Sequence, residues 1–319
     1  MDTIPSATFF NSSILMNHFV SRRDFLQQLS LLAGASLLSL EAEAKKANIQ
    51  MGYSAITWGG KDDVAIKEIA SLGFPGIQLR ANTFGPYRNK VSELKDLIEA
   101  NHLKLAMFSS GNIEVDPAKR QSTIDMHVAH ASFVKALGGS AIQMTNSLRK
   151  GGVAPTTDEL KQLTAVMNEV GKQTADLGVQ AVYHNHMAQW GETPEEVDVI
   201  VNEMNPKYVK LLLDVAHYHQ GGGKPADAVL KYKSIIHSLH IKDTMCPLPD
   251  KPNDPKAYRF VELGRGNVDL VAVFNNLRKI NFKGWAVVEL DGVPEKEKTP
   301  LQCAGISKQF LIEKAGIKL

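Results

Sequence analysis

Histidines and carboxylates gather in four short segments of the C-terminal half of the chain. Imidazole nitrogen together with carboxylate oxygen is the donor set of Mn²⁺, Fe²⁺, Co²⁺ or Zn²⁺, whereas Ca²⁺ prefers oxygen alone. We therefore predict one bound divalent metal, with Mn²⁺ as the first choice and Co²⁺, Fe²⁺ and Zn²⁺ as alternatives. The segments are V-Y-H-N-H at 182–186, L-L-L-D-V-A-H at 211–217, H-S-L-H-I-K-D at 237–243 and V-V-E-L-D at 287–291.

Each segment closes an apolar run of strand length, and side chains along a strand alternate between two faces. In the third segment, Leu239 and Ile241 suit a surface covered by helices, so His240 and Lys242 point the other way. The same alternation places the two histidines of the first segment on one face. The polar side chains therefore project together from strand ends.

Apolar runs alternate with amphipathic stretches along the chain after residue 48. Eight strand–helix units in about 270 residues predict a (β/α)8 TIM barrel of the α/β class. An open doubly wound sheet would need a glycine-rich turn after its first strand. The nearest candidate, at 264–266, comes too late, so we interpret it as a loop. The predicted strands are 49–57, 76–80, 104–109, 141–146, 179–186, 208–215, 235–242 and 285–290, and predicted helices include 64–72, 91–101, 124–137, 157–177, 194–204 and 270–280.

The N-terminal residues have the pattern of an export signal. Arg22 and Arg23 precede an uncharged apolar stretch, 29–40, that is too short to span a bilayer. The motif S-R-R-x-F-L resembles a twin-arginine signal, and a small-residue cleavage motif, A-E-A, follows the stretch. We predict a leader over 1–44, a single barrel domain over 45–319, a periplasmic or otherwise exported location, and no stable membrane insertion after the leader is removed.

Composition narrows the class of protein. A formal net charge of +2 over 319 residues lacks the basic excess of a nucleic-acid binder. We therefore predict a small-molecule partner and no nucleic acid, and leave a homo-oligomer open. Cys246 and Cys303 lie far apart without C-x-x-C spacing, which favours isolated thiols over a zinc site or a disulfide.

From about Ile49 onward the sequence resembles the xylose-isomerase-like TIM barrels, which include sugar isomerases, ketose epimerases and inosose dehydratase. Members of this family hold one divalent metal with residues from the ends of strands five to eight. The motifs that carry the resemblance are L-D-V-A-H at 213–217, H-I-K-D at 240–243, L-G-R-G-N-V-D at 263–269 and G-W-A-V-V-E-L-D at 284–291.

The resemblance implies a role for each site residue. Glu289 would act as the base as well as a ligand, His217 would contact substrate hydroxyls, and Lys242 would lie near the carbonyl. The implied metal ligands are His184, Asp214, His240 and Glu289.

One position departs from the epimerase pattern. The epimerases carry a glutamate at the strand-five ligand position, where it serves as a second base, and here that position is His184. Epimerisation removes a proton on one face and returns it on the other, so a single carboxylate favours elimination, with Glu289 as base and a histidine or Lys242 as acid. The pattern is closer to the inosose dehydratase branch, in which a strand-five H-x-H also occurs. The remaining histidines leave an isomerase or epimerase open as the alternative.

Export also bears on the substrate, because phosphorylated sugars are kept in the cytoplasm. Neither an arginine cluster nor a glycine-rich phosphate cradle follows strands seven and eight. We therefore expect an unphosphorylated keto-sugar, keto-glycoside or keto-cyclitol. The candidates for contact with this small carbohydrate are Trp58, Arg80, His186 and His217.

Two other classes of protein compete with this interpretation. A DNA-repair endonuclease would need further His and Glu ligands from strands two to four, and F-S-S-G at 108–111 supplies none. A non-catalytic periplasmic sugar-binding protein would have no need of the Asp214, His240 and Glu289 set. We expect an enzyme, either a metal-dependent lyase of the dehydratase type or a sugar isomerase/epimerase.

Overall fold

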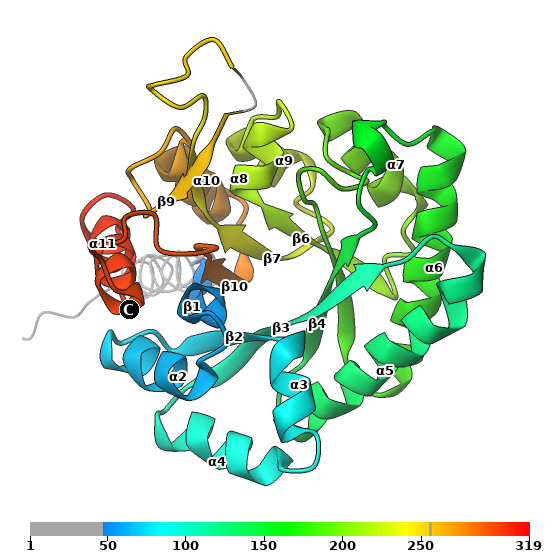
Figure 1. Ribbon diagram of the computed structural model, residues 1–319, viewed down its shortest axis with the longest axis horizontal. Helices are drawn as coiled ribbons and strands as arrows, with labels where there is room; N and C mark the ends of the chain where they lie inside the picture. The colour runs from blue at the N-terminus through cyan, green and yellow to red at the C-terminus, as the bar shows by residue number, and fades with distance from the viewer. Residues whose placement is uncertain (1–46, 255–256) are drawn as a thin grey trace, which may run out of the picture. The chain divides into compact units, whose positions relative to one another are not determined.

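Eight parallel strands close into a barrel (Figure 1). The computed structural model describes residues 47–254 and 257–319, so the predicted leader over 1–44 lies outside the described residues. All eight predicted strands are confirmed, and the last, β10, closes the barrel by pairing with β1. The barrel strands are β1 (Asn48–Ser54), β2 (Gly76–Arg80), β3 (Lys104–Ile113), β4 (Ala141–Asn146), β5 (Gln180–His184), β6 (Val209–Asp214), β7 (Ile236–Ile241) and β10 (Lys283–Val288).

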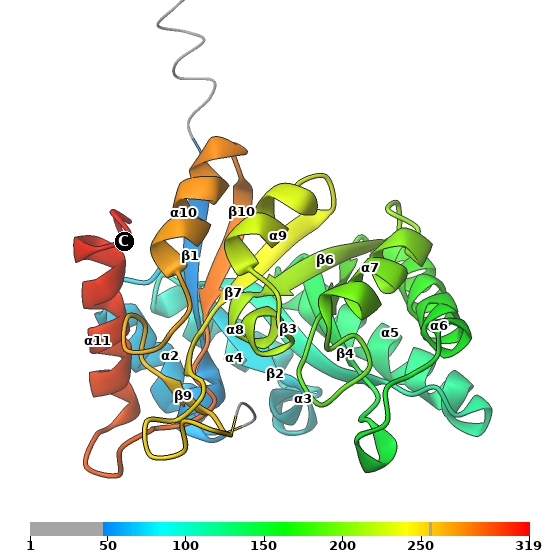
Figure 2. The same cartoon turned by 90° about the horizontal axis from the view of Figure 1, so that it is seen from above.

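Helices surround the barrel (Figure 2). The longest, α6, begins with a capping box in which Thr156 and Glu159 satisfy each other's backbone N–H groups. No helix in the described ranges is long and apolar enough to cross a membrane. The helices are α2 (Asp62–Ser71), α3 (Ala81–Tyr87), α4 (Val91–Ala100), α5 (Arg120–Ala136), α6 (Thr157–Asp176), α7 (Pro194–Glu203), α8 (Val215–Gln220), α9 (Pro225–Lys231), α10 (Leu270–Lys279) and α11 (Pro300–Glu313), with short 3₁₀ turns η1 (Ala55–Trp58), η2 (Pro117–Lys119) and η3 (Lys150–Gly152).

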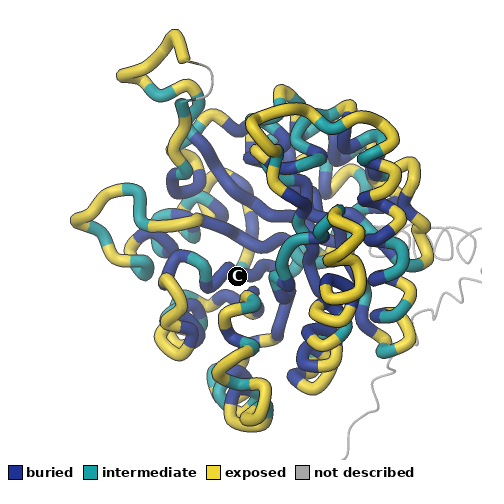
Figure 3. The backbone as a smooth tube through the Cα atoms, turned by 45° about the vertical axis from the view of Figure 1, so that its right-hand side comes forward, coloured by how far each residue is buried: buried dark blue, intermediate teal, exposed yellow. Residues whose placement is uncertain are grey.

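The barrel interior changes from apolar to polar along its axis. Most of the exposed backbone lies in helices and loops around the buried strands (Figure 3). One apolar layer of the interior includes Ala141, Val182 and Leu212. Two residues further along the same strands, β4, β5 and β6, the inward positions are Gln143, His184 and Asp214. The interior therefore presents the candidate ligands toward the carboxyl ends of these strands, where TIM barrels place their active sites.

A short antiparallel hairpin, β8 (Asp243–Met245) and β9 (Arg259–Val261), follows β7 and is absent from the sequence predictions. The buried carboxylate of Asp243 accepts hydrogen bonds from the N–H groups of Gly264 and Gly266, at 2.9 and 3.0 Å. A Cβ at Gly266 would lie 2.2 Å from this carboxylate, so only glycine fits there. The predicted loop at 264–266 is confirmed. No disulfide is formed by the cysteines of the described residues.

A buried hydrogen-bond network between β3 and α5 joins Ser110 to two histidines. Ser110 Oγ lies 2.6 Å from His127 Nδ1 and 2.9 Å from His130 Nδ1. His130 Nδ1 also lies 3.1 Å from the Ser110 carbonyl, and His127 Nε2 lies 3.3 Å from the Asn112 carbonyl. His130 therefore donates through Nδ1–H, Ser110 donates to His127, and His127 donates through Nε2–H, with both rings neutral. The network secures β3 where its register with β4 shifts between Ser109 and Gly111.

This network makes stability depend on pH. Burial lowers the pKa of His127 from its ordinary 6.5 to about 4. The unfolded chain therefore binds a proton between these values that the folded chain does not. The contribution of His127 to the free energy of unfolding is fully present above pH 6.5. It decreases by about 3 kcal/mol as the pH falls from 6.5 to 4.

Urea unfolding at pH 7.5 and pH 4.5 measures this effect. His127→Asn is expected to reduce the difference between the two pH values relative to wild type, while the exposed control His102→Asn leaves it unchanged. An identical pH dependence for both variants would show that His127 does not contribute.

Candidate metal centre and active site

Asp214 lies at the centre of the predicted ligand cluster. It ends β6 and is fully buried, with Oδ2 3.3 Å from His184 Nε2 and 3.4 Å from His240 Nδ1. Glu289, the residue after β10, brings Oε1 to 3.4 Å from the same His240 nitrogen. Closure of the barrel therefore brings together all four side chains that the sequence analysis nominates as ligands.

Two sets of three donors have spacing that would suit a metal ion, with donor atoms within 4.8 Å of one another. One set is Asp214, His240 and Glu289, and the other is His184, Asp214 and His217. His217 belongs to α8, which starts directly after β6, and its backbone N–H donates to Asp214 Oδ1 at 2.8 Å. The structure thus adds His217, expected as a substrate contact, to the possible ligands.

The orientation of His240 leaves one nitrogen available to a metal. Its Nε2 lies 2.9 Å from Gln78 Oε1, an acceptor, so Nε2 carries the proton and Nδ1 the lone pair. Nδ1 is buried and makes no hydrogen bond within the described part of the chain. A buried lone pair facing two carboxylates is unfavourable unless a positive charge lies between them. These residues therefore fit a divalent ion.

Gln143 contacts the imidazole of His184, the second histidine among the ligand candidates. Its Nε2 lies 2.8 Å from His184 Nδ1, whereas its Oε1 is buried and finds no hydrogen-bond partner among the residues that the structure describes. A half-turn of this amide would let Oε1 accept a hydrogen bond from Nδ1–H and would leave the His184 Nε2 lone pair facing Asp214. His184 can therefore be presented as a ligand by a local rotation, without backbone movement.

Glu289 and Lys242 form a buried ion pair, with 3.3 Å between Oε1 and Nζ. Burial raises the pKa of Glu289, but its neighbours, among them the Lys242 ammonium group, outweigh this and lower that pKa to about 2, so the side chain is a carboxylate at neutral pH. Burial lowers the pKa of Lys242, but Asp291, 2.6 Å away, and Glu289 hold that pKa above its ordinary value. Lys242 therefore stays an ammonium group.

Three histidines near Asp214, His184, His186 and His217, are neutral. Burial lowers the pKa of His184 and brings that of His217 well below its ordinary value. Burial, with the positive charge of Lys242 nearby, lowers the pKa of His186 to about 4. Neutral imidazole is the form that binds metals and accepts protons.

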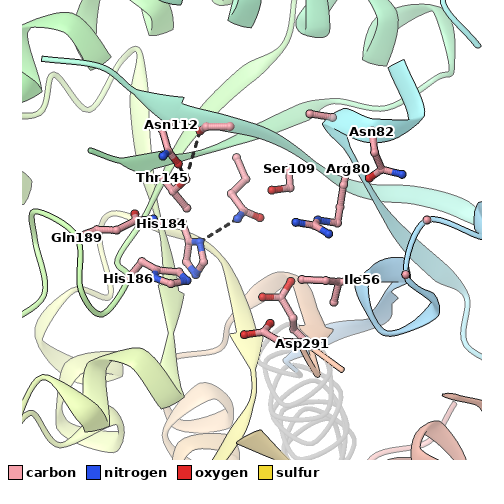
Figure 4. Close-up of a pocket in the computed structure, with 16 residues that line it drawn as sticks. Ile56, Arg80, Asn82, Ser109, Asn112, Thr145, His184, His186, Gln189 and Asp291 are labelled. Carbon is pink, nitrogen blue, oxygen red and sulfur yellow. Dashed lines mark hydrogen bonds between the residues drawn. The ribbon is translucent and has the colours of Figure 1, made fainter. Parts of the chain in front are cut away.

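A cavity of about 570 Å³, hereafter the first cavity, opens at the carboxyl ends of the strands (Figure 4). Its wall includes His184, Glu289 and Asp291. Arg80, which ends β2, and His186 also line it, as expected for substrate contacts. A cavity of this size accommodates a small carbohydrate.

Three side chains that the sequence analysis assigns to substrate contact or catalysis lie away from this wall, as do the ligand candidates Asp214 and His240. Trp58 is 5% exposed, and its indole N–H donates to Glu68 at 2.6 Å, which differs from the substrate contact expected from the sequence. His217 and Lys242 are fully buried and covered by the ring of Phe260, so they reach the first cavity only through neighbouring side chains. Lys242 therefore acts on Glu289 and Asp291 rather than directly on a ligand in this arrangement.

Comparison with known proteins places the chain in a family. Residues 66–307 match the family described as "Xylose isomerase-like TIM barrel". The match spans the strands that carry every ligand candidate. The chain belongs to this family.

Several members and structural relatives of the xylose isomerase-like barrels are similar along nearly their whole length. An inosose dehydratase of Clostridium botulinum is 27% identical over 299 residues, covering 84% of this chain and 98% of that protein. The IolI protein with a bound zinc atom superposes with a TM-score of 0.70 at 19% identity, covering 84% of this chain and 98% of that one. A D-allulose 3-epimerase from Methylomonas superposes with a TM-score of 0.67 at 20% identity, with the same coverage. The chain is accordingly an enzyme of the dehydratase or isomerase/epimerase type.

Four residues that support the site in this family member are absent from the sequence predictions. Gln78 donates to Glu289 Oε2 at 2.9 Å while it accepts from His240. Asn185 Nδ2 donates to the Asp214 carbonyl, and its Oδ1 accepts from the Asp214 N–H. The signal for two of the residues is a glutamine between two large apolar residues of a strand, I-Q-L in β2 and I-Q-M in β4. The four are Gln78, Gln143, Asn185 and Asp291.

Proposed function

We propose that this chain abstracts the proton alpha to the carbonyl of an unphosphorylated keto-sugar, keto-glycoside or keto-cyclitol in a metal-dependent reaction, and that elimination follows. The main support is the Glu289–Lys242 pair, 3.3 Å apart, with Glu289 in the wall of the first cavity. The base is already ionised and a positive charge lies beside it. Proton abstraction next to a carbonyl needs a base in its ionised form, and the neighbouring ammonium group keeps Glu289 ionised.

The proposed ligands are His184, Asp214, His240 and Glu289. When bound there, a divalent metal would act as a Lewis acid toward the carbonyl oxygen and stabilise its developing negative charge. Mn²⁺ stays our first choice, and the bound zinc of the structurally similar IolI protein supports a divalent ion in general. A mixed nitrogen and oxygen donor set accepts either ion.

The proton path follows from the charges of the side chains. Glu289 takes the proton from carbon, and the electron pair moves toward the carbonyl oxygen. In elimination, the carbon–oxygen bond beta to the carbonyl then breaks, and the departing oxygen needs a proton. Lys242 is a poor donor because its pKa is raised, so we assign this proton to the newly protonated Glu289. Water or an alcohol leaves, and an unsaturated ketone remains.

An isomerase or epimerase is the second candidate, and His186 is the observation that favours it. Its Nδ1 lies 2.7 Å from the Met187 carbonyl and therefore carries the proton, which leaves Nε2 as an acceptor. A second base could return the proton to the opposite face. If so, His186→Gln would lower kcat on the order of 10²- to 10⁴-fold, whereas elimination through Glu289 alone would be far less affected.

Removal of the metal is expected to abolish activity. After dialysis against a chelator, conversion of keto-glycosides and keto-cyclitols should fall at least about 100-fold, because the charge on the carbonyl oxygen loses its stabilisation. Added Mn²⁺ should restore it. The ultraviolet absorbance of the conjugated ketone measures both. Full activity in protein shown by elemental analysis to be metal-free would contradict the proposal.

We also propose that the chain is exported in folded form by the twin-arginine route, on the support of the S-R-R-x-F-L motif and the apolar stretch after it. A metal loaded in the cytoplasm would be a reason to use that route. Replacing Arg22 and Arg23 with lysine is expected to retain the protein in the cytoplasm on cell fractionation. Equal export of the two versions would contradict this.

A further inference from the structure

A second cavity of about 660 Å³ adjoins the first cavity. Its wall comes from the segments that follow β3 and β4, together with Trp190 after β5. Asn112 lines both cavities. A β-bridge also joins Leu148, in the second wall, to Gln189, in the first. A ligand that fills the first cavity therefore has a neighbouring space into which a substituent can extend.

The second cavity presents apolar side chains to solvent. Leu148 and Val153 are 64% and 70% exposed, more than any other large apolar side chain in the described residues. Trp190 lies in the same wall. Exposed apolar side chains gathered around a hollow, next to an active site, are typical of a binding surface.

The polar side chains of this wall are largely engaged already. Glu114 pairs with Lys119 at 3.9 Å, and Asp116 accepts from the backbone of η2 at 3.0 Å. Glu159 is held by Thr156 in the capping box of α6. A sugar would need free polar partners along its edge, so the wall suits an apolar ligand better than a second sugar.

The wall is also preformed. Arg149, between Leu148 and η3, contacts both carboxylate oxygens of Glu196 at 2.5 and 2.7 Å and pairs with Glu192 at 2.8 Å. Its side chain is 10% exposed, and its backbone N–H donates to the Ala188 carbonyl. Arg149 Nη2 reaches both Glu196 oxygens while Nε reaches Glu192, and such short charge-assisted contacts restrict the position of the side chain. The segment that carries Leu148 is thereby tied to the segment that carries Trp190.

We propose that the second cavity binds the apolar, ring-shaped aglycone of a glycoside whose sugar occupies the first cavity. This inference rests on the proposed function for the sugar and selects the keto-glycoside among its three substrate classes. Trp190 supplies an aromatic side chain to the wall, and Leu148 and Val153 supply exposed apolar side chains. The departing oxygen of the elimination, or the retained glycosidic oxygen, would connect the two parts of the ligand.

Equilibrium binding of unreactive glycosides tests the inference without turnover. We expect 4-nitrophenyl glucoside to bind the full chain at least about tenfold more tightly than methyl glucoside, measured by titration calorimetry. The double variant Leu148→Ser/Val153→Ser should remove most of this preference. Val271→Ser/Ile312→Ser, which also changes two exposed apolar side chains but lines neither cavity, should keep it.

Three outcomes would overturn the inference: equal affinities for the two glucosides, an unchanged preference in the Leu148/Val153 variant, or tighter binding of a disaccharide than of the aryl glucoside. The probes carry no ketone, so the result is independent of the proposed chemistry. Tighter binding of the aryl glucoside without turnover of any keto-sugar would support the aglycone site and reject the proposed reaction. Turnover of keto-sugars without tighter binding of the aryl glucoside would support the reaction and reject the aglycone site.

Discussion

Replacing Glu289 with glutamine is expected to lower kcat by on the order of 10³-fold or more while the barrel remains folded. The amide keeps the shape of the side chain and can still accept from Gln78, but it cannot take a proton from carbon. A positioned base contributes about 10²- to 10⁴-fold, and the loss of a negative metal ligand adds to this. Initial rates on keto-glycosides, with circular dichroism to verify folding, measure the effect.

Glu195→Gln is the matched control for this experiment. Glu195 is an exposed carboxylate in the first turn of α7, so the variant loses the same charge outside the candidate ligand sets and the wall of the first cavity. We expect wild-type rates from it. A Glu289→Gln protein that retains more than about a tenth of the wild-type rate would exclude Glu289 as the base.

Asp214→Asn is expected to weaken Mn²⁺ binding at least about 100-fold and to abolish turnover with it. Asp214 is the only residue common to both candidate ligand sets, and its Oδ2 faces His184 and His240. Even residues that merely orient metal ligands contribute about 10- to 100-fold to affinity, so a central carboxylate should contribute at least as much. Calorimetric titration of metal-free protein with Mn²⁺ measures the change.

The asparagine retains an oxygen that can accept from the His217 N–H, so the start of α8 should persist. Asp176→Asn, an exposed change at the end of α6, is the control and should bind Mn²⁺ like wild type. Wild-type affinity in the Asp214 variant would place the metal elsewhere.

The strands and the candidate ligands were accessible from the sequence because their signals are local. A run such as L-L-L-D in β6 is apolar on both faces and then ends in a carboxylate, which is the pattern of a buried parallel strand at an active site. The same holds for His184 and Glu289 at the ends of β5 and β10. Barrel closure then brings such strand ends together without further sequence information.

The features that the sequence did not reveal depend on contacts between distant segments. The hairpin strands β8 and β9 have three residues each, and their position depends on Asp243 binding a loop about twenty residues away. Gln78 matters only because closure brings β2 toward Glu289, 211 residues later. The substrate contact predicted for Trp58 is not observed, because an aromatic side chain near a strand end can face either a ligand or the core. The hydrogen bond to Glu68 holds Trp58 in the core.

Proton NMR in D₂O tests the central claim most directly. The Mn²⁺-loaded mature protein is incubated with keto-glycosides and keto-cyclitols, and the metal is chelated before spectra are recorded. We predict metal-dependent loss of the signal of the proton beside the carbonyl, with formation of an unsaturated ketone and release of water or an aglycone. No loss of that signal on any of these substrates, from protein verified to bind Mn²⁺, would contradict the proposed reaction.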